Sequence, residues 1–140
     1  MPRPQSEYLT TLTHAPAEAV KAVAETVIDQ LGEITVITNR TGLVMLPYTD
    51  TVKGARFHLG EVLVSESHVR IGAGTEGYAV CMGRDLEQSL AIALIDAALQ
   101  AEIAVATLTA FIDAQATAQA DADAALLRRV EKTRVELETF

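Results

Sequence analysis

The chain has 140 residues, of which 49% are hydrophobic and 4% aromatic, and its formal net charge is −8 at pH 7. This length predicts a single domain over residues 1–140 that folds around its own core without metals or disulfides. The one cysteine excludes a disulfide framework and multi-cysteine metal sites, and the acidic balance opposes nucleic-acid binding. Because residues 1–10 have no apolar run like that of a signal peptide, we expect a cytoplasmic protein.

Two helical segments are predicted at the start of the chain. Apolar residues gather on one side of a short helical turn within residues 2–13. A longer helix is expected over residues 16–31, where Pro16 suits the first turn and Gly32 marks the end. Its apolar face is formed by residues at intervals of three and four, namely Val20, Val23, Val27 and Leu31.

Four or five short strands are predicted between residues 34 and 82. Apolar runs alternate with turn-forming residues at 39–42, 65–67 and 72–77, and Gly60-Glu61 indicates a bulge. Short turns favour an antiparallel meander, because parallel neighbours need crossovers of about a dozen residues or more. The G-x-G-x-x-G pattern at 72–77 precedes a strand and not a helix, so we interpret it as a turn and not as a phosphate-binding loop.

Long helices are predicted for the rest of the chain, because residues 84–140 contain neither glycine nor proline. Asp85 followed by Gln88 has the form of a helix start. A helix over residues 86–120 would be about 50 Å long, whereas a compact domain of this size is only about 37 Å across. Alanine and small polar residues at 114–125 indicate a junction to a last helix.

The segment from Leu90 to Ile112 is apolar on nearly all sides of the predicted helix. Asp96, Glu102 and the absence of flanking aromatic or basic belts argue against a membrane span. A helix that is longer than the body covering it must either bend or bury its excess face against another protein chain. The predicted fold class is therefore α+β, with an antiparallel sheet of four or five short strands packed with an N-terminal helical segment and long C-terminal helices.

Few residues are arranged as metal or anion sites. His58 and His68 could meet across a hairpin, but two histidines without a carboxylate or thiolate do not make a metal signature. Arg84, at the predicted junction of strand and helix, could present its charge and free amides to an anion. We favour the alternative, in which the Asp85 carboxylate caps the helix and occupies those amides.

A second candidate anion site is a basic face formed by Arg56, His58 and Arg70 on the predicted third and fourth strands. That face could hold phosphate oxygens or an acidic partner, and a plain solvated face is the favoured alternative. Asp96 requires a polar partner, because an unpaired buried carboxylate costs several kcal/mol. We expect an arginine of this chain or of a partner chain to pair with it, and not catalysis, since no second acid lies at a defined spacing.

Six short motifs stand in order along the chain: Thr41-Gly42-Leu43-Val44, Arg56-Phe57 with Gly60-Glu61, Gly77-Tyr78, Gly83-Arg84-Asp85, Ala93-Leu94-Ile95-Asp96-Ala97, and Thr133-Arg134-Val135-Glu136. Their order and spacing together resemble the PhnG family, the G subunit of the carbon-phosphorus lyase core complex. The resemblance covers most of the chain, from about residue 8 to the C-terminus.

This resemblance implies an assembly in which the G, H, I and L subunits act together. A phosphonate displaces adenine from MgATP, and a J subunit later cleaves the carbon-phosphorus bond. The resemblance implies no catalytic residues, metal or directly bound cofactor for this chain, and MgATP is a substrate of the complex. The I subunit is the expected main partner, with H, J and L subunits in the same oligomer.

Four residues are candidate contributors of charge or interfacial pairing in such an assembly: Arg56, Arg84, Asp96 and Arg134. The competing hypothesis is a homo-oligomeric interaction module without a catalytic role. It would use the same apolar helix to pair with itself and would bind a small anion on the face of Arg56, His58 and Arg70.

Overall fold

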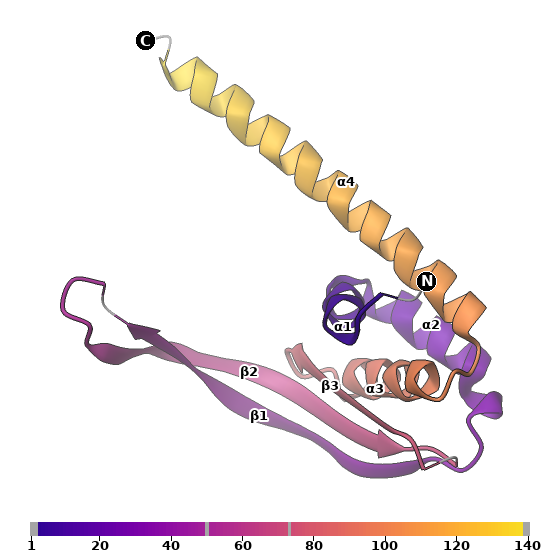
Figure 1. The fold of residues 1–140 in the computed structure, drawn as a ribbon. Helices are drawn as coiled ribbons and strands as arrows, with labels where there is room; N and C mark the ends of the chain where they lie inside the picture. The colour runs from indigo at the N-terminus through magenta and orange to yellow at the C-terminus, as the bar shows by residue number, and fades with distance from the viewer. Residues whose placement is uncertain (1–2, 50, 73, 139–140) are drawn as a thin grey trace.

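The structure is a computed structural model that describes residues 3–49, 51–72 and 74–138. A sheet carries helices on one of its faces, and a last long helix leaves the body (Figure 1). The elements in chain order are α1 (Gln5–His14), α2 (Ala17–Val27), the 3₁₀ turn η1 (Ile28–Gln30), β1 (Thr35–Thr49), β2 (Arg56–Arg70), β3 (Glu76–Met82), α3 (Leu86–Gln100) and α4 (Val105–Glu138). The fold is α+β, as the sequence predicts.

The sheet is an antiparallel meander in the order β1-β2-β3. The predicted topology is confirmed, but the number of strands is three and not four or five. β1 runs without interruption through residues 39–42 and β2 through residues 65–67, where turns were expected. These two polar segments pair with each other instead, as Asn39 with Ser67, Arg40 with Glu66 and Thr41 with Ser65.

The chain reverses between β1 and β2, where Gly54 takes a left-handed φ of 65°. The ladder shifts register close to this turn, so that Leu46 pairs with Gly60 and Pro47 with His58. β2 has one extra residue there, which is a bulge beside the predicted position at Gly60-Glu61.

The two N-terminal helices agree with the sequence prediction. α1 lies within residues 2–13 apart from its last residue, and α2 with η1 covers most of residues 16–31. Gly32 follows with a φ of 76°, a conformation that glycine adopts without strain. The apolar side chains of these helices that are buried in the core include Leu12, Val20, Val27 and Leu31.

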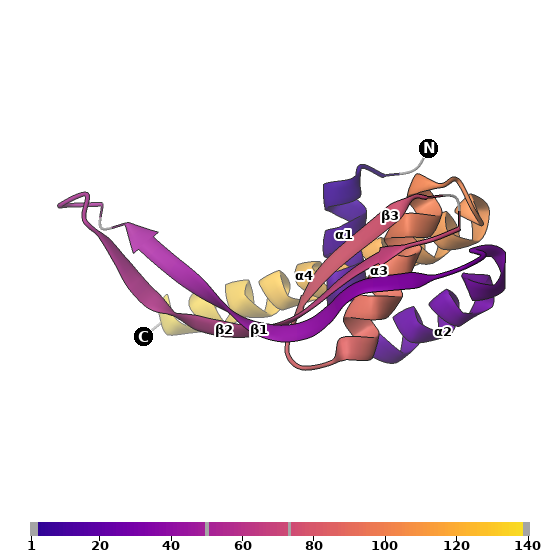
Figure 2. The same cartoon turned by 90° about the horizontal axis from the view of Figure 1, so that it is seen from below.

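α3 lies directly on the sheet, and every residue from 91 to 98 is buried. Seen from below, the sheet lies in front of α3 and its outer face carries no helix (Figure 2). Gly77 of β3 permits this close packing, because a Cβ at that position would lie 2.0 Å from the Ala93 carbonyl oxygen and 2.6 Å from the Ala97 nitrogen. No larger residue fits there without moving the helix.

The predicted helix over residues 86–120 is in fact two helices. α3 ends at Gln100, and the Ile103 amide donates to the Ala98 carbonyl oxygen at 2.8 Å while the Glu102 amide donates to Leu99 at 3.1 Å. This pair of bonds is a Schellman motif, with Glu102 in the left-handed position at a φ of 59°. α4 then runs through residues 114–125, so the junction expected there is wrong.

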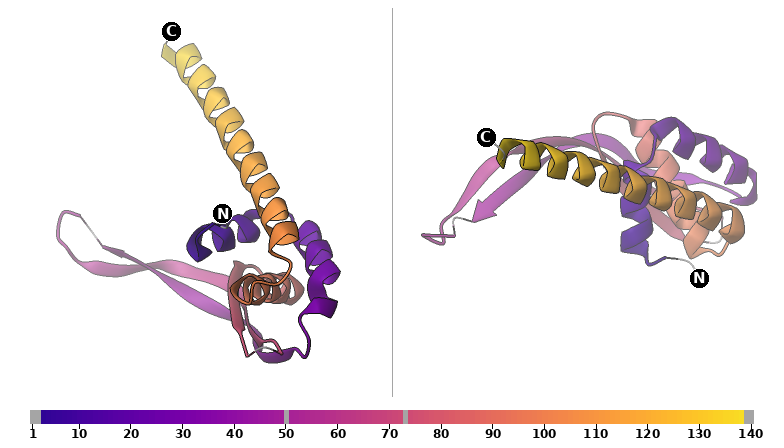
Figure 3. Two further views of the ribbon diagram at one scale, coloured as in Figure 1. Left: turned by 45° about the vertical axis from the view of Figure 1, so that its right-hand side comes forward. Right: turned by 90° about the horizontal axis from the view of Figure 1, so that it is seen from above.

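Two segments extend beyond the body on the same side of the molecule (Figure 3). One is the distal part of α4, residues 120–138, of a helix about 51 Å long. The other is the hairpin arm, residues 43–49 and 51–62, which lies past the last β2–β3 pair, Val64 with Met82. The expected overshoot is present, but the most apolar stretch of α3 is buried within its own chain.

Candidate functional site

Asp96 is 1% exposed and joins three elements from its place in the middle of α3. Its carboxyl oxygens accept hydrogen bonds from the Tyr8 hydroxyl at 2.5 Å, the Gln5 amide at 3.1 Å and the Tyr78 backbone amide at 3.0 Å. The prediction of a polar partner is confirmed, but these partners are neutral donors and not an arginine. Burial and then Asp96 raise the pKa of Tyr8 far above its usual value, so the hydroxyl keeps its proton and donates.

A cavity of ≈ 540 Å³ lies beside this cluster, between the start of α1 and the α3–α4 junction. Its lining residues are Arg3, Gln5, Tyr8, Leu99, Gln100, Glu102 and Val105. The Gln5 amide is bonded to Asp96, and the Tyr8 hydroxyl accepts from the Gln100 amide at 3.1 Å. The buried polar atoms of the described side chains all have partners. The cavity therefore offers a ligand few unsatisfied groups.

Asp85 caps α3, as predicted, since its carboxylate accepts from the Gln88 amide at 3.0 Å. The same carboxylate forms an ion pair with Lys21 of α2 at 2.9 Å. Lys21 first, and then the Gln88 amide, lowers the pKa of Asp85. Asp85 therefore occupies an amide at the start of α3 that an anion would need. Arg84, which is exposed beside it, does not combine with a free helix terminus into an anion site.

The basic face predicted on two strands is not formed. Arg56 and Arg70 lie at opposite ends of the single strand β2, about 46 Å apart along the strand. Arg70 pairs with Glu76 at 2.9 Å, and His68 lies 3.4 Å from the same carboxylate. Arg70 first, and then His68, lowers the pKa of Glu76.

His58 also stands on β2, ten positions before His68, so the two histidines do not face each other across a hairpin. The side chain of His58 lies outside the described part of the structure. Arg134 lies on the distal part of α4. This part of the helix leads away from the sheet (Figure 1). The four residues nominated from the sequence therefore do not form one site.

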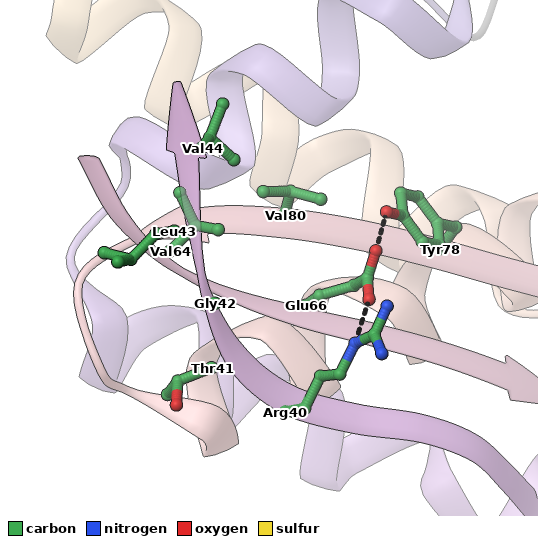
Figure 4. A pocket seen from close by; sticks show the side chains of 9 residues that line it. All are labelled: Arg40, Thr41, Gly42, Leu43, Val44, Val64, Glu66, Tyr78 and Val80. Atoms are coloured by element: carbon green, nitrogen blue, oxygen red, sulfur yellow. Dashed lines mark hydrogen bonds and ion pairs between the residues drawn. The ribbon is translucent and has the colours of Figure 1, made fainter. Parts of the chain in front are cut away.

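The outer face of the sheet holds a polar network that the sequence analysis missed. Glu66 lies between Arg40 and Tyr78 (Figure 4), accepting from the Arg40 guanidinium at 2.9 Å and from the Tyr78 hydroxyl. The Tyr78 hydroxyl and then Arg40 lower the pKa of Glu66, and Glu66 raises the pKa of Tyr78. The network borders a cavity of ≈ 330 Å³ that also includes Val64 and Val80. To predict this network, the sequence analysis would have had to recognise residues 56–70 as one strand that pairs Glu66 with Arg40.

The single cysteine lies under α3 and is buried. Burial, and to a smaller extent Asp85, raises the pKa of the Cys81 thiol to about 11. Such a thiol is protonated at neutral pH and is a poor nucleophile or metal ligand. Across the described residues, no three His, Cys, Asp or Glu side chains are grouped to hold a metal ion.

Exposed apolar side chains gather on the two projecting segments. On the sheet and hairpin arm they include Leu43, Val44, Met45, Leu59 and Met82, and on distal α4 they are Leu126, Leu127 and Val130. None of the helices in the described ranges is long and apolar enough to cross a bilayer. These exposed apolar side chains make the sheet with its arm, and distal α4, the candidate binding surfaces of the chain.

The fold and its surfaces define a small α+β domain whose two projecting elements offer contact area outside its own core. The family model described as phosphonate metabolism protein PhnG matches residues 3–140. The chain therefore belongs to the PhnG family, and the resemblance found from the six motifs is confirmed. A search of curated proteins gave no match.

Proposed function

We propose that this chain is an accessory subunit of the carbon-phosphorus lyase core complex. With the H-, I- and L-type subunits it is required to transfer the ribose 5-triphosphate of MgATP to an alkylphosphonate, with release of adenine. It contributes no catalytic set and binds no cofactor directly, and MgATP is the substrate of the whole complex. Its main partner is the I-type subunit, which docks on α4, and H-, J- and L-type subunits belong to the same assembly.

The observation that carries this proposal is the surface area of the chain. The isolated chain exposes 9094 Å², whereas a compact monomer of its mass exposes about 7,000 Å². The excess of about 2,000 Å² is the area that one subunit contributes to a large permanent interface. A role within an assembly explains why a chain of the PhnG family exposes this excess surface.

The chemistry of the reaction also supports this division of labour. Displacement of adenine at the ribose C1′ requires an acid for the leaving base and cations that position two highly charged substrates. In this chain the buried Asp96 is occupied by three donors, and Arg40 and Arg70 are paired with glutamates. The net charge of −8 also repels polyphosphates. Neighbouring subunits are better suited to supply the reacting groups.

Adenine release tests the proposed role directly. The chain is purified alone, and the H-, I- and L-type subunits are prepared with and without it. We expect adenine release from MgATP plus methylphosphonate only when all four are present. Release by this chain alone, or full activity of the three other subunits without it, contradicts an accessory role.

Docking through α4 is tested by co-purification with the I-type subunit. The double variant Leu126→Lys with Val130→Lys places charge on the exposed apolar side chains of distal α4 and is expected to abolish co-purification. A control, Ala118→Lys with Ala122→Lys, adds the same charge at exposed alanines of the same helix and is expected to retain it. Sizing that shows only a self-assembly of this chain favours the homo-oligomeric alternative.

A further inference from the structure

The hairpin arm exposes apolar side chains on both of its faces. Leu43 pairs with Leu63 on one face, and Val44 pairs with Val62 on the other. Leu43 is 63% and Val44 is 44% exposed. Since successive residues of a strand point to opposite sides, neither face of the arm is a polar face turned to water.

This pattern differs from that of an ordinary exposed ribbon. A strand with one solvated face alternates apolar and polar residues, whereas a strand that is covered on both faces is a continuous apolar run. Residues 43–46 of β1 form such a run. Nearer the body, α3 covers Ser65 and Ser67 completely, but the arm extends past the helix. A two-stranded ribbon without cover is at best marginally stable in water.

The backbone edges of the arm are open as well. β3 pairs with β2 only from Val64 to Arg70, and β1 pairs with β2 alone. Residues 57–62 of β2 therefore have a neighbouring strand on one side only, as has β1 along its length, whereas the Leu63 carbonyl oxygen already accepts from the Gly83 amide at 2.8 Å. Free strand edges pair readily with another chain.

The arm is also the electrically neutral part of a strongly acidic chain. Residues 43–62 contain two acidic residues, Asp50 and Glu61, and two basic residues, Lys53 and Arg56. Their formal charges cancel, so the net charge of −8 falls entirely on the remainder of the chain. All four charged residues lie at positions 50–61, so residues 43–49 carry no charge that would lose its hydration when they are covered.

We propose that the hairpin arm inserts into a cleft of a different protein chain of the assembly, with apolar walls covering both faces of the arm. This inference rests on the proposed function and adds to it a second attachment besides α4. The two walls bury Leu43 and Met45 on one side and Val44 on the other, and a strand of the cleft pairs with an open edge of the arm. This contact accounts for part of the excess surface.

A second copy of this chain is a poorer occupant. The cavity beside the start of α1 has a volume of ≈ 540 Å³, a size suited to a small molecule and not to a ribbon. This cavity also presents the charged side chains of Arg3 and Glu102 beside its apolar surface. Two arms that met edge to edge would pair their backbones but would leave both apolar faces in water.

The test uses one lysine on each face of the arm in the full-length chain, co-expressed with the H-, I-, J- and L-type subunits. The variants are Leu43→Lys and Val44→Lys. The control is Val36→Lys, on the same strand outside the arm, where the side chain is 47% exposed. Circular dichroism of each purified chain establishes folding, and mass spectrometry measures the amount bound to the other subunits. We expect both arm variants to fold and to bind at least tenfold less than the wild type, and the control to bind normally.

Each other outcome overturns the insertion. Loss of binding for one arm variant alone indicates a contact on a single face. Normal binding of both variants shows that the arm is not an attachment, while the accessory role remains supported by the wild type. An isolated wild-type chain that sizes as a dimer, and as a monomer after Val44→Lys, identifies a second copy as the occupant. Failure of the wild type to bind the other subunits rejects the proposed function and the insertion with it.

Discussion

At the scale of single residues, Asp96 acts as a structural acceptor that holds α1, α3 and β3 together. Asp96→Asn replaces one carboxyl oxygen by an amide that must face a donor, whichever way the side chain is turned. We expect a loss of about 2–3 kcal/mol in the free energy of unfolding by urea. Tyr8→Phe removes one of the three donors and the acceptor of the Gln100 amide, and is expected to cost about 1.5 kcal/mol. A smaller loss for Asp96→Asn than for Tyr8→Phe would contradict this role.

Gly77 is required by the close approach of α3 to β3. In Gly77→Ala the added Cβ meets the backbone of Ala93 and Ala97, which cannot rotate away as a side chain would. We expect a loss of about 3 kcal/mol, seen as a melting temperature lower by about 10 °C. Gly42→Ala is the matched control, because no atom lies within 4 Å of a Cβ at that position of β1. Equal melting temperatures for the two variants would show that the packing is looser than described.

Asp85 combines a helix cap with an ion pair, and the pH dependence of stability separates the two. Its pKa is lowered in the folded protein by Lys21 and the Gln88 amide. A carboxyl group whose pKa is lower in the folded than in the unfolded protein stabilises the fold at pH values above its unfolded pKa of about 3.9. This contribution to stability is lost as the pH falls through the folded pKa. Lys21, whose pKa is raised by Asp85, keeps its charge until strongly alkaline pH. The pair therefore stabilises the fold from about pH 5 to pH 10.

Two variants of Asp85 test this reasoning. Asp85→Asn retains a good helix cap and removes the charge, so its deficit in unfolding free energy at pH 7 should shrink below pH 4. Asp85→Ala also removes the cap and should cost about 1 kcal/mol more. Urea unfolding at pH 3, 5 and 7 measures both. A deficit of Asp85→Asn that grows towards pH 3 has the wrong sign and would refute the ion pair.

At the scale of elements, the end of α3 depends on Glu102 in a left-handed conformation. Glycine adopts that conformation without the side-chain penalty, although it gains freedom in the unfolded chain. We expect Glu102→Gly to stabilise the protein by about 0.5–1 kcal/mol. Ala110→Gly, at an exposed position within α4, should instead destabilise it by about 1 kcal/mol. Destabilisation by both substitutions would argue for one continuous helix.

The same junction explains what sequence patterns can and cannot predict. Local signals placed Asp85 at a helix start and Gly32 at a helix end, because each residue performs its role through its own backbone. A helix end with glutamate in the glycine position carries no such signal, so the pattern of residues 86–120 predicts one helix. The turns expected at 39–42 and 65–67 failed for a different reason, since polar residues that favour turns also pair across strands.

The candidate site shows a similar limit. The sequence predicts that Asp96 has a hydrogen-bond partner, because a buried carboxylate requires one. It does not predict that the donor is Tyr8, because that depends on how α1 docks against α3. The sequence pattern groups Arg56 with Arg70 because it predicts a turn at residues 65–67, whereas both residues lie on the single strand β2. The network of Arg40, Glu66 and Tyr78 requires the register of three strands, which no local pattern contains.

At the scale of the whole molecule, the body and the two projecting segments should differ in local stability. The body has a buried core around α3, whereas the arm has two strands and no cover. In the isolated chain we therefore expect slow amide hydrogen exchange in α3 and β3, and exchange in residues 43–49 and 56–62 faster by at least a hundredfold. Both rates follow from one exchange experiment on the full chain.

Assembly should reverse that contrast. If the arm is enclosed by a partner chain, its ladder opens only when the complex releases it, so exchange in residues 43–49 and 56–62 should slow towards that of α3. The first turns of α4, residues 105–112, already pack against the body and serve as the internal reference whose exchange changes little. An arm that exchanges as fast in the complex as in the isolated chain would show that it remains in solvent. The excess surface would then have to be covered through distal α4 and the outer face of the sheet.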